Sequence, residues 1–405
     1  MDLKEQINNI KLIDDHMHAL DDVQWITGTG SFPWPALLSS VQLPDNMTTI
    51  QRREAFFTAY RELYGFEETT LNPENIKKLN DIYQENRVDE SKVFDKVFEA
   101  ANIECVVEVN QDSLELPATL DPQKYKLAPM VDALLVPLDN TEFSKSLPND
   151  TARLFIKMYQ VFLKNVIGDR KIDSFDDYLE FISSLLADIR ARGCACLKMN
   201  FGYWRDLEVE EVSKEEARDI FESNDTSPVR YKRLQDYILR YLIASSAEFD
   251  LPTQIHVGGP VPQSMMITNP VRLDSFLLLP DIQKAKVVLL HGGYPYCREA
   301  GYMANRSFAP NIYLDISQYW QVLYSSPIGM VGILREWFEM GLAEKMLYGS
   351  DSVTPISTYI SAVHFREGLY LALKGMIDDG MISEDQALDM ARMVMRENAK
   401  KLYKL

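Results

Sequence analysis

Short apolar runs recur along the chain and are separated by longer stretches in which apolar residues repeat with helical spacing. The apolar runs lie at residues 12–13, 103–109, 133–136, 194–197, 253–255, 286–290, 312–316 and 345–347. Short buried strands that alternate with helices indicate βαβ units and a parallel sheet, and eight such units close a barrel. The pattern therefore predicts an α/β fold, a TIM (β/α)8 barrel that spans residues 1–405 as a single domain.

The first two predicted strands are separated by residues 19–101, which is too long for an ordinary βα loop. Apolar periodicity predicts helices at 48–64 and 75–99 within it. A segment inserted after the first strand emerges at the carboxyl face of a barrel, where it can form a lid or a wall of the site. We predict a helical insertion here, with Trp34 either contacting substrate or packing.

The same periodicity predicts further helices after the third strand. They lie at residues 150–166, 174–192, 230–249, 271–279, 328–340 and 356–374. A capped helix is predicted from Ser383, because Ser383-Glu384-Asp385 has the composition of a helix start.

The composition of the chain limits the classes of partner that we expect. The formal net charge of −18 would repel nucleic acid and anionic lipid. No apolar run is long enough to cross a bilayer, and the first residues lack the pattern of a secretory leader. We expect a cytoplasmic protein that acts on a small molecule, with no nucleic-acid or membrane partner, and leave open whether it forms homo-oligomers. The four cysteines are predicted to be buried thiols.

Histidines are scarce and their positions are informative. Of the five in the chain, four follow predicted strands: His16, His18, His256 and His291. Strand ends of an α/β barrel meet at one mouth, and a His-x-His pair in extended backbone places both rings on one face. Neutral imidazole is a favoured ligand of zinc and similar ions. Each histidine alone would also fit a core, but the four together indicate a divalent-metal site.

Two further residues follow strands at this mouth. Asp351, in Tyr348-Gly349-Ser350-Asp351-Ser352, can bind an ion and take a proton from water, although such an aspartate is also a common turn or cap residue. Lys198 follows the fourth apolar run. Its amine could reach solvent, bind substrate as an ammonium group, or carry a carbamate that bridges two metal ions.

Together these motifs resemble the amidohydrolase superfamily, specifically its amidohydrolase-related branch. They are also similar to the amidohydrolase-type domain that occurs fused to glutamine synthetase. The matching residues are Asp15-His16-Met17-His18, Lys198, His256-Val257-Gly258, His291-Gly292-Gly293-Tyr294-Pro295, Asn311-Ile312-Tyr313-Leu314-Asp315 and Tyr348-Gly349-Ser350-Asp351.

The resemblance implies roles for these residues. His16, His18 and Asp351 would bind the more buried ion, with zinc as the expected metal. In a site with two ions, His256 and His291 would bind the second one and a carbamate on Lys198 would bridge the pair. In a site with one ion, His256 would complete its ligands and His291 would position the water.

The resemblance also implies a metal-dependent hydrolase, in which a metal-activated water attacks an amide, ester or lactone of a small carboxylated substrate. Asp351, His291 and Lys198 would be the catalytic residues. The alternatives are a decarboxylase or a uronate-type isomerase on the same barrel, or a metal-binding protein without turnover.

Besides Trp34, three residues are candidate substrate contacts. Tyr203 and Arg205 follow the fourth strand closely, and Arg205 could bind a carboxylate or form a surface salt bridge. Arg298 opens a predicted helix, where packing or capping is the alternative. Asp315 could face the mouth or fix a neighbouring side chain.

Overall fold

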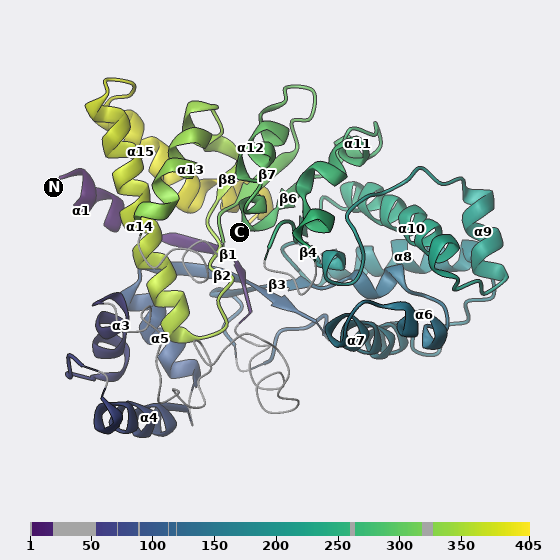
Figure 1. Cartoon of the computed structure of the whole chain (residues 1–405), viewed down its shortest axis with the longest axis horizontal. Helices are drawn as coiled ribbons and strands as arrows, with labels where there is room; N and C mark the ends of the chain where they lie inside the picture. Colours follow the sequence, from purple (N-terminus) through teal and green to yellow (C-terminus); the bar gives the residue numbers. More distant parts are fainter. Residues whose placement is uncertain are drawn as a thin grey trace. The chain divides into compact units, whose positions relative to one another are not determined.

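The computed structural model describes residues 2–18, 54–70, 72–87, 90–111, 113–118, 120–259, 264–317 and 327–405 (Figure 1). It divides into two compact units. Unit 1 comprises Met1–Val109, Pro117–Lys126 and Ile316–Lys401, and unit 2 comprises Asn110–Leu116, Leu127–Asp315 and Leu402–Leu405. The single-domain organisation stays a prediction.

The strands agree with the sequence pattern at all but one place. The described residues contain eight: β1 (Leu12–Met17), β2 (Ile103–Asn110), β3 (Tyr125–Pro129), β4 (Leu197–Met199), β5 (Thr253–Ile255), β6 (Val287–Leu289), β7 (Ile312–Asp315) and β8 (Met346–Leu347). Each predicted strand except the third overlaps one of these.

The third predicted strand was wrong. Residues 133–136 belong instead to the buried 3-10 helix η1 (Asp132–Leu135) and the residue after it. The N–H of Leu134 donates to the carbonyl of Val131, as a 3-10 turn requires. The strand is β3, whose apolar pattern is interrupted by Lys126 and ended by Pro129, so the short apolar run after it gave the stronger signal.

Unit 1 contains the helical insertion. In the described residues, α3 (Glu54–Tyr64), α4 (Pro73–Arg87) and α5 (Glu90–Ala100) come between β1 and β2 in sequence, which confirms the helical segment after the first strand. β1 and β2 pair in parallel, with Leu12 opposite Ile103. Figure 1 shows α3 and α5 beside α14 (Pro355–Asp378), on which both pack.

The remaining helices of unit 1 also have clear boundaries. They are α1 (Leu3–Asn8), α13 (Ile328–Glu339), α15 (Glu384–Arg392), a π-helix (Met393–Glu397) and α16 (Asn398–Tyr403), which ends in unit 2. The Ser383 hydroxyl accepts the N–H of Gln386, and the Gln386 side chain accepts the N–H of Ser383. This capping box confirms the helix predicted to begin there.

A buried arginine ties several segments of unit 1 together. The Arg366 guanidinium, on α14, donates to main-chain oxygens only: those of Ile7, Asn8, Ile10, Ala101 and Asn102. Its side chain is almost fully enclosed, and burial lowers the pKa of Arg366 to about 10. Carbonyls near the ends of α1 and α5 thereby gain the hydrogen bonds that a helix end leaves unmade.

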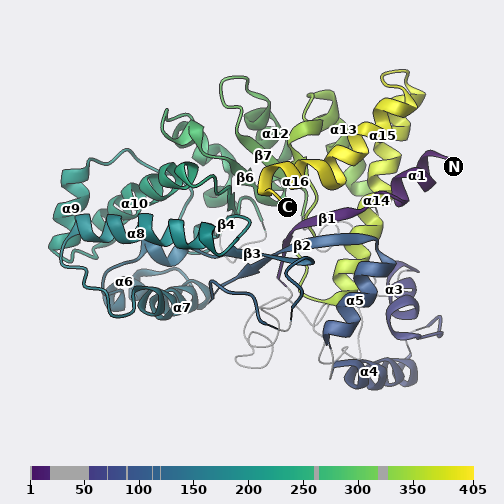
Figure 2. The same ribbon diagram turned by 180° about the vertical axis from the view of Figure 1, so that it is seen from behind.

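Unit 2 is built on parallel strands in register. Residues Leu197, Thr253, Val287 and Ile312 lie opposite one another across β4, β5, β6 and β7. Around them lie α6 (Thr141–Ser146), α7 (Asp150–Ile167), α8 (Phe175–Ala191), α9 (Lys214–Glu222), α10 (Pro228–Glu248), α11 (Asp274–Leu277) and α12 (Cys297–Asn305). Figure 2 shows α8 beside α10, and the two are in contact. Because the strands share one register, the residues that follow them lie at one edge of the sheet.

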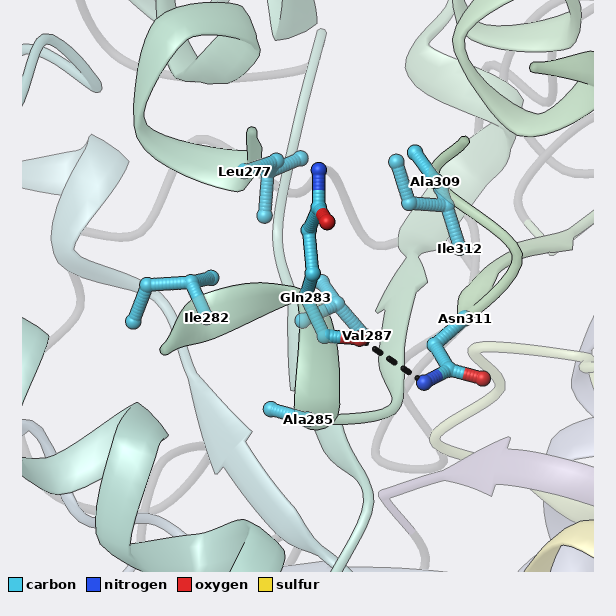
Figure 3. A pocket seen from close by; sticks show the side chains of 8 residues that line it. All are labelled: Leu277, Ile282, Gln283, Ala285, Val287, Ala309, Asn311 and Ile312. Atoms are coloured by element: carbon cyan, nitrogen blue, oxygen red, sulfur yellow. Dashed lines mark hydrogen bonds between the residues drawn. The ribbon is translucent and has the colours of Figure 1, made fainter. Parts of the chain in front are cut away.

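A small pocket lies at the other end of these strands. Figure 3 shows its lining, which includes Val287 and Ile312, the first residues of β6 and β7, and Ala285 and Asn311, which precede these strands. The Asn311 amide donates to the carbonyl of Gln283 at 2.9 Å. The pocket has room for roughly one water molecule. The pocket and His291 lie at opposite ends of β6, because His291 follows the carboxyl end of that strand.

Candidate metal centre

The first cluster of predicted ligands lies in unit 1, on β1. Every residue of β1 is buried, His16 lies in this strand, and His18 directly follows it. Their ring centroids are 4.9 Å apart. The N–H of His18 donates to the carbonyl of Ser352 at 2.8 Å, so this end of β1 is bonded to the segment that follows β8. The two rings therefore lie next to each other, as the His-x-His spacing allows.

Asp351 completes this cluster. One of its carboxylate oxygens, Oδ1, lies 3.2 Å from the Nε2 atom of His16 and 3.2 Å from the Nε2 atom of His18. Atoms bound at roughly 2.0–2.1 Å to a tetrahedral zinc ion lie about 3.3 Å from one another. Two imidazole nitrogens and a carboxylate oxygen at this spacing fit a divalent ion of the zinc type. We call His16, His18 and Asp351 the first ligand cluster.

The backbone at Asp351 is held in an uncommon conformation. Its φ is +48°, which is rare outside glycine, and its N–H donates to the carbonyl of His16 at 2.8 Å. The preceding N–H, that of Ser350, donates to the buried carboxylate of Asp14 at 2.9 Å. Asp14 also accepts the N–H of His16. Such a conformation persists only where several bonds determine it, and here they direct the carboxylate of Asp351 toward the two imidazoles.

A chain of buried hydroxyl groups continues this support. Ser350 Oγ lies 2.5 Å from Ser352 Oγ, which lies 2.8 Å from the hydroxyl of Thr358. Thr358 donates its hydroxyl proton to the carbonyl of Thr354. Ser352 therefore donates to Thr358, and Ser350 donates to Ser352. Sequence analysis missed Asp14 and these hydroxyls. A second carboxylate directly after the apolar run Leu12-Ile13, one residue before Asp15, was the available signal for Asp14.

The second cluster, which we define as His256 and His291, lies in unit 2. Nε2 of His291 is 2.8 Å from Nδ1 of His256, and both side chains are buried. His256 directly follows β5 and His291 follows β6 by one residue. The N–H of His291 donates to a carboxylate oxygen of Asp315 at 2.9 Å. Of the two roles predicted for Asp315, the structure supports that of fixing a neighbouring residue.

Glycines allow the segment after β5 and the segment after β6 to approach each other closely. A Cβ atom at Gly258 would lie 2.2 Å from the carbonyl oxygen of Tyr294, and the φ of Gly258 is +74°. A Cβ atom at Gly293, whose φ is +66°, would lie 3.0 Å from the ring of Pro270. The N–H of Gly259 donates to that same oxygen of Tyr294. Only glycine fits at 258, and this close approach brings the two imidazoles together.

Lys198 is buried, which contradicts the interpretation that its amine reaches solvent. It lies in β4 opposite Gln254, two residues before the level of His256. The carboxylate of Asp132, also in unit 2, is fully buried near this strand end and accepts the N–H of Asn200. Burial raises the pKa of Asp132 to about 7, while the N–H of Asn200 and the charge of Lys198 oppose the rise. Whether Lys198 carries a carbamate stays a prediction.

The predicted substrate contacts have different surroundings. The Tyr203 ring lies 4.7 Å from the His256 ring between centroids. Arg205 is buried and donates to Asp236 at 2.5 Å, so its guanidinium binds a carboxylate of the chain itself and not at the surface. Arg298 is exposed in the first turn of α12. Trp34 lies outside the described residues.

Comparison with known proteins shows to which family the chain belongs. A family model described as Amidohydrolase matches residues 193–405, more than half of the chain. The chain belongs to the amidohydrolase family. It is therefore an enzyme of the amidohydrolase superfamily, as the motifs indicated. Among the described residues of this family member, no helix is both long and apolar enough to cross a membrane.

Relatives of this amidohydrolase cover all or nearly all of its length. Protein fluG of Emericella nidulans is 23% identical over 436 residues, which cover 100% of the chain and 47% of that protein. The chain thus spans about half the length of this curated relative.

Solved structures share its fold. A protein from Lactobacillus casei described as a metal-dependent hydrolase is 22% identical with a TM-score of 0.67, over 100% of this chain and 97% of that one. Glucuronate isomerase from Caulobacter crescentus is 14% identical with a TM-score of 0.69, over 99% and 93%. Uronate isomerase from Thermotoga maritima is 13% identical with a TM-score of 0.66, over 99% and 96%. The fold class is the α/β TIM barrel with a helical insertion after β1.

Proposed function

We propose that this chain is a metal-dependent hydrolase that cleaves an amide, ester or lactone bond of a small carboxylated molecule, with zinc as its metal. The observation that carries the proposal is the first ligand cluster, in which one oxygen of Asp351 lies 3.2 Å from Nε2 of both His16 and His18. Family membership supports the same reaction type.

The residues of the first ligand cluster have distinct tasks. His16 is fully buried and held by the bonds of β1, so it would be a rigid ligand. His18 and Asp351 keep 18% and 11% of their side chains exposed, which leaves them open to a reactant. When bound, the ion supplies an activated water and polarises the bond under attack. Asp351 accepts a proton at a carboxylate oxygen and returns it to the leaving group.

His256, His291 and Lys198 stay predicted ligands. The adjacent imidazoles of the second cluster are suited to bind an ion, because each offers a ring nitrogen. Asp315 and the turn at Gly258 would preorganise them. The Lys198 amine is buried and would have to be neutral to react with carbon dioxide, so a carbamate on Lys198 stays a prediction.

The substrate class rests on fewer observations. Tyr203 beside His256 could contact a substrate bound near the second cluster. Arg298, exposed in the first turn of α12, stays a predicted contact for a substrate carboxylate. The Arg205 guanidinium donates to Asp236, Gln235 and two carbonyls of the chain itself. Trp34 stays a predicted contact.

Uronate isomerisation is a second candidate function. It is supported by the fold shared with uronate isomerase from Thermotoga maritima and glucuronate isomerase from Caulobacter crescentus. An isomerase would use the same ligands to move a proton between neighbouring carbons without adding water to the product. Decarboxylation stays a third possibility for the same residues.

A substrate panel with matched variants tests the proposal. Zinc-loaded full-length protein is assayed on amides, esters and lactones of small carboxylic acids and on uronates, before and after treatment with a chelator. We expect hydrolysis that the chelator abolishes, and a loss of roughly 10²–10⁴ in kcat for Asp351→Asn. Asp379→Asn is the control, because Asp379 is an exposed residue that follows α14.

The products separate the candidate functions. Conversion of a uronate to a ketose with no hydrolysis anywhere in the panel would favour the isomerase. Release of carbon dioxide would favour the decarboxylase. Hydrolysis that survives Asp351→Asn at the wild-type rate would contradict the assigned role of Asp351.

A further inference from the structure

Asn200 lies directly after β4 and is bound at both its main chain and its side chain. Its N–H donates to the two carboxylate oxygens of Asp132 at 2.9 and 3.0 Å. Its side-chain oxygen accepts the hydroxyl of Tyr159, on α7, at 2.5 Å. All three side chains are buried in unit 2. Two elements outside the sheet, η1 and α7, thus fix the position and the orientation of Asn200.

Asn200 begins the turn that carries Tyr203. This turn is the 3-10 helix η2 (Phe201–Tyr203), and the carbonyl of Asn200 accepts the N–H of Tyr203 at 2.9 Å. The Tyr203 ring contacts two others, with its centroid 5.3 Å from that of Phe155 on α7 and 4.7 Å from that of His256. A shift of Asn200 would therefore move the aromatic ring that borders the imidazole.

The turn has little room to absorb such a shift. A Cβ atom at Gly202 would lie 2.9 Å from the Cγ2 methyl of Thr268 and 3.8 Å from the carbonyl oxygen of His256. The N–H of His256 also donates to the carbonyl of Met199, immediately before Asn200. Closely packed segments transmit small displacements rather than dissipate them.

We propose that Tyr159 is a positioning residue for His256: its hydroxyl holds Asn200, Asn200 sets the turn, and the Tyr203 ring orients the imidazole. The inference deepens the proposed function, since it concerns a predicted metal ligand. Tyr159 acts through Asn200 and Tyr203 and takes no part in bond making. Burial keeps the pKa of Tyr159 far above its usual value, so the hydroxyl remains a donor at every working pH.

Tyr159→Phe removes this hydroxyl and keeps the ring. Tyr241→Phe is the matched control, because it removes one hydroxyl bond of 2.8 Å, to Ser183, where α8 faces α10. Asn200→Leu removes the acceptor of the Tyr159 hydroxyl and should reproduce the effect if Tyr159→Phe does not fold. Far-ultraviolet circular dichroism and urea titration establish that each variant is folded.

The first readout is the ring signal of His256 in the metal-free full-length chain. Proton–carbon NMR spectra of protein labelled at the histidine ring carbons resolve the five histidines, and His256→Asn identifies the signal of that residue. We expect Tyr159→Phe to shift the His256 signal, because the neighbouring Tyr203 ring changes its orientation. Tyr241→Phe should leave it in place. An unshifted His256 signal in both Tyr159→Phe and Asn200→Leu overturns the inference.

The second readout is zinc affinity, measured by competition with a chromogenic chelator. Loss of support behind a histidine ligand typically weakens metal binding by about tenfold or more, and we expect a tenfold loss for Tyr159→Phe with no change for Tyr241→Phe. Equal zinc affinities of wild type and Tyr159→Phe would also overturn the inference while leaving the hydrolase proposal intact. A wild-type chain that binds no zinc would overturn the hydrolase proposal, and the His256 signal would then decide the inference alone.

Discussion

Replacing Gly258 with alanine introduces a methyl group where the segments after β5 and β6 touch. The added carbon would lie 2.2 Å from the Tyr294 carbonyl oxygen and 2.6 Å from the Gly293 carbonyl carbon, so main chain must move. Its φ of +74° adds about 1–2 kcal/mol of strain for a residue with a side chain. With the displaced main chain included, we expect a loss of roughly 3–5 kcal/mol in the free energy of unfolding.

Gly193→Ala separates the two contributions. Gly193, also in unit 2, has a φ of +79°, and nothing lies within 4 Å of an added Cβ atom. This control should lose only the strain of about 1–2 kcal/mol. Urea titration of both variants measures the difference, provided that the dependence of the unfolding free energy on urea is unchanged. Equal losses for the two variants would refute the close approach as the constraint at Gly258.

Two further predictions concern stability. Arg366→Met should lower the free energy of unfolding by roughly 2–4 kcal/mol, because the lost bonds to carbonyls outweigh the relief of a buried charge. Urea titration beside Arg335→Met checks this, because Arg335 is a partly exposed arginine whose ion pairs go to surface carboxylates. An equal effect of the two substitutions would contradict the prediction. Hydrogen bonds from Lys286 and Lys404 lower the pKa of Asp250 to about 2, so the advantage of wild type over Asp250→Asn should be constant above pH 4 and disappear as pH falls through 2. Thermal unfolding across this range measures it, and a constant difference down to pH 2 would contradict the pairing.

The strand ends with their histidines were predictable because two independent signals coincide there. Apolar runs mark the strands, and the chemistry of His16, His256 and His291 marks their carboxyl ends. β3 was missed because Lys126 and Pro129 obscure its apolar pattern. Here the local pattern identified strands where the apolar run was clear and missed the one in which a lysine and a proline interrupt it.

The hydrogen-bond partners that hold the turn after β4 could not be predicted from the sequence, for a different reason. Arg205 bonds to Asp236, which lies 31 positions later on α10, and no spacing rule links a turn residue to a distant helix. Tyr159 and Asn200 are separated by 41 positions in the same way. Such pairs depend on how the helices pack against the strand ends, which a single sequence does not encode as a local pattern.

Zinc retained by the full-length protein after dialysis tests the central claim most directly, when it is measured for wild type and for His16→Asn, with His364→Asn as a control on α14. Mass spectrometry of the metal, divided by protein concentration, gives ions per chain. We predict one or two ions per wild-type chain, an equal content in His364→Asn, and the loss of at least one ion in His16→Asn. Equal zinc content in His16→Asn and wild type would contradict the assignment of the first ligand cluster.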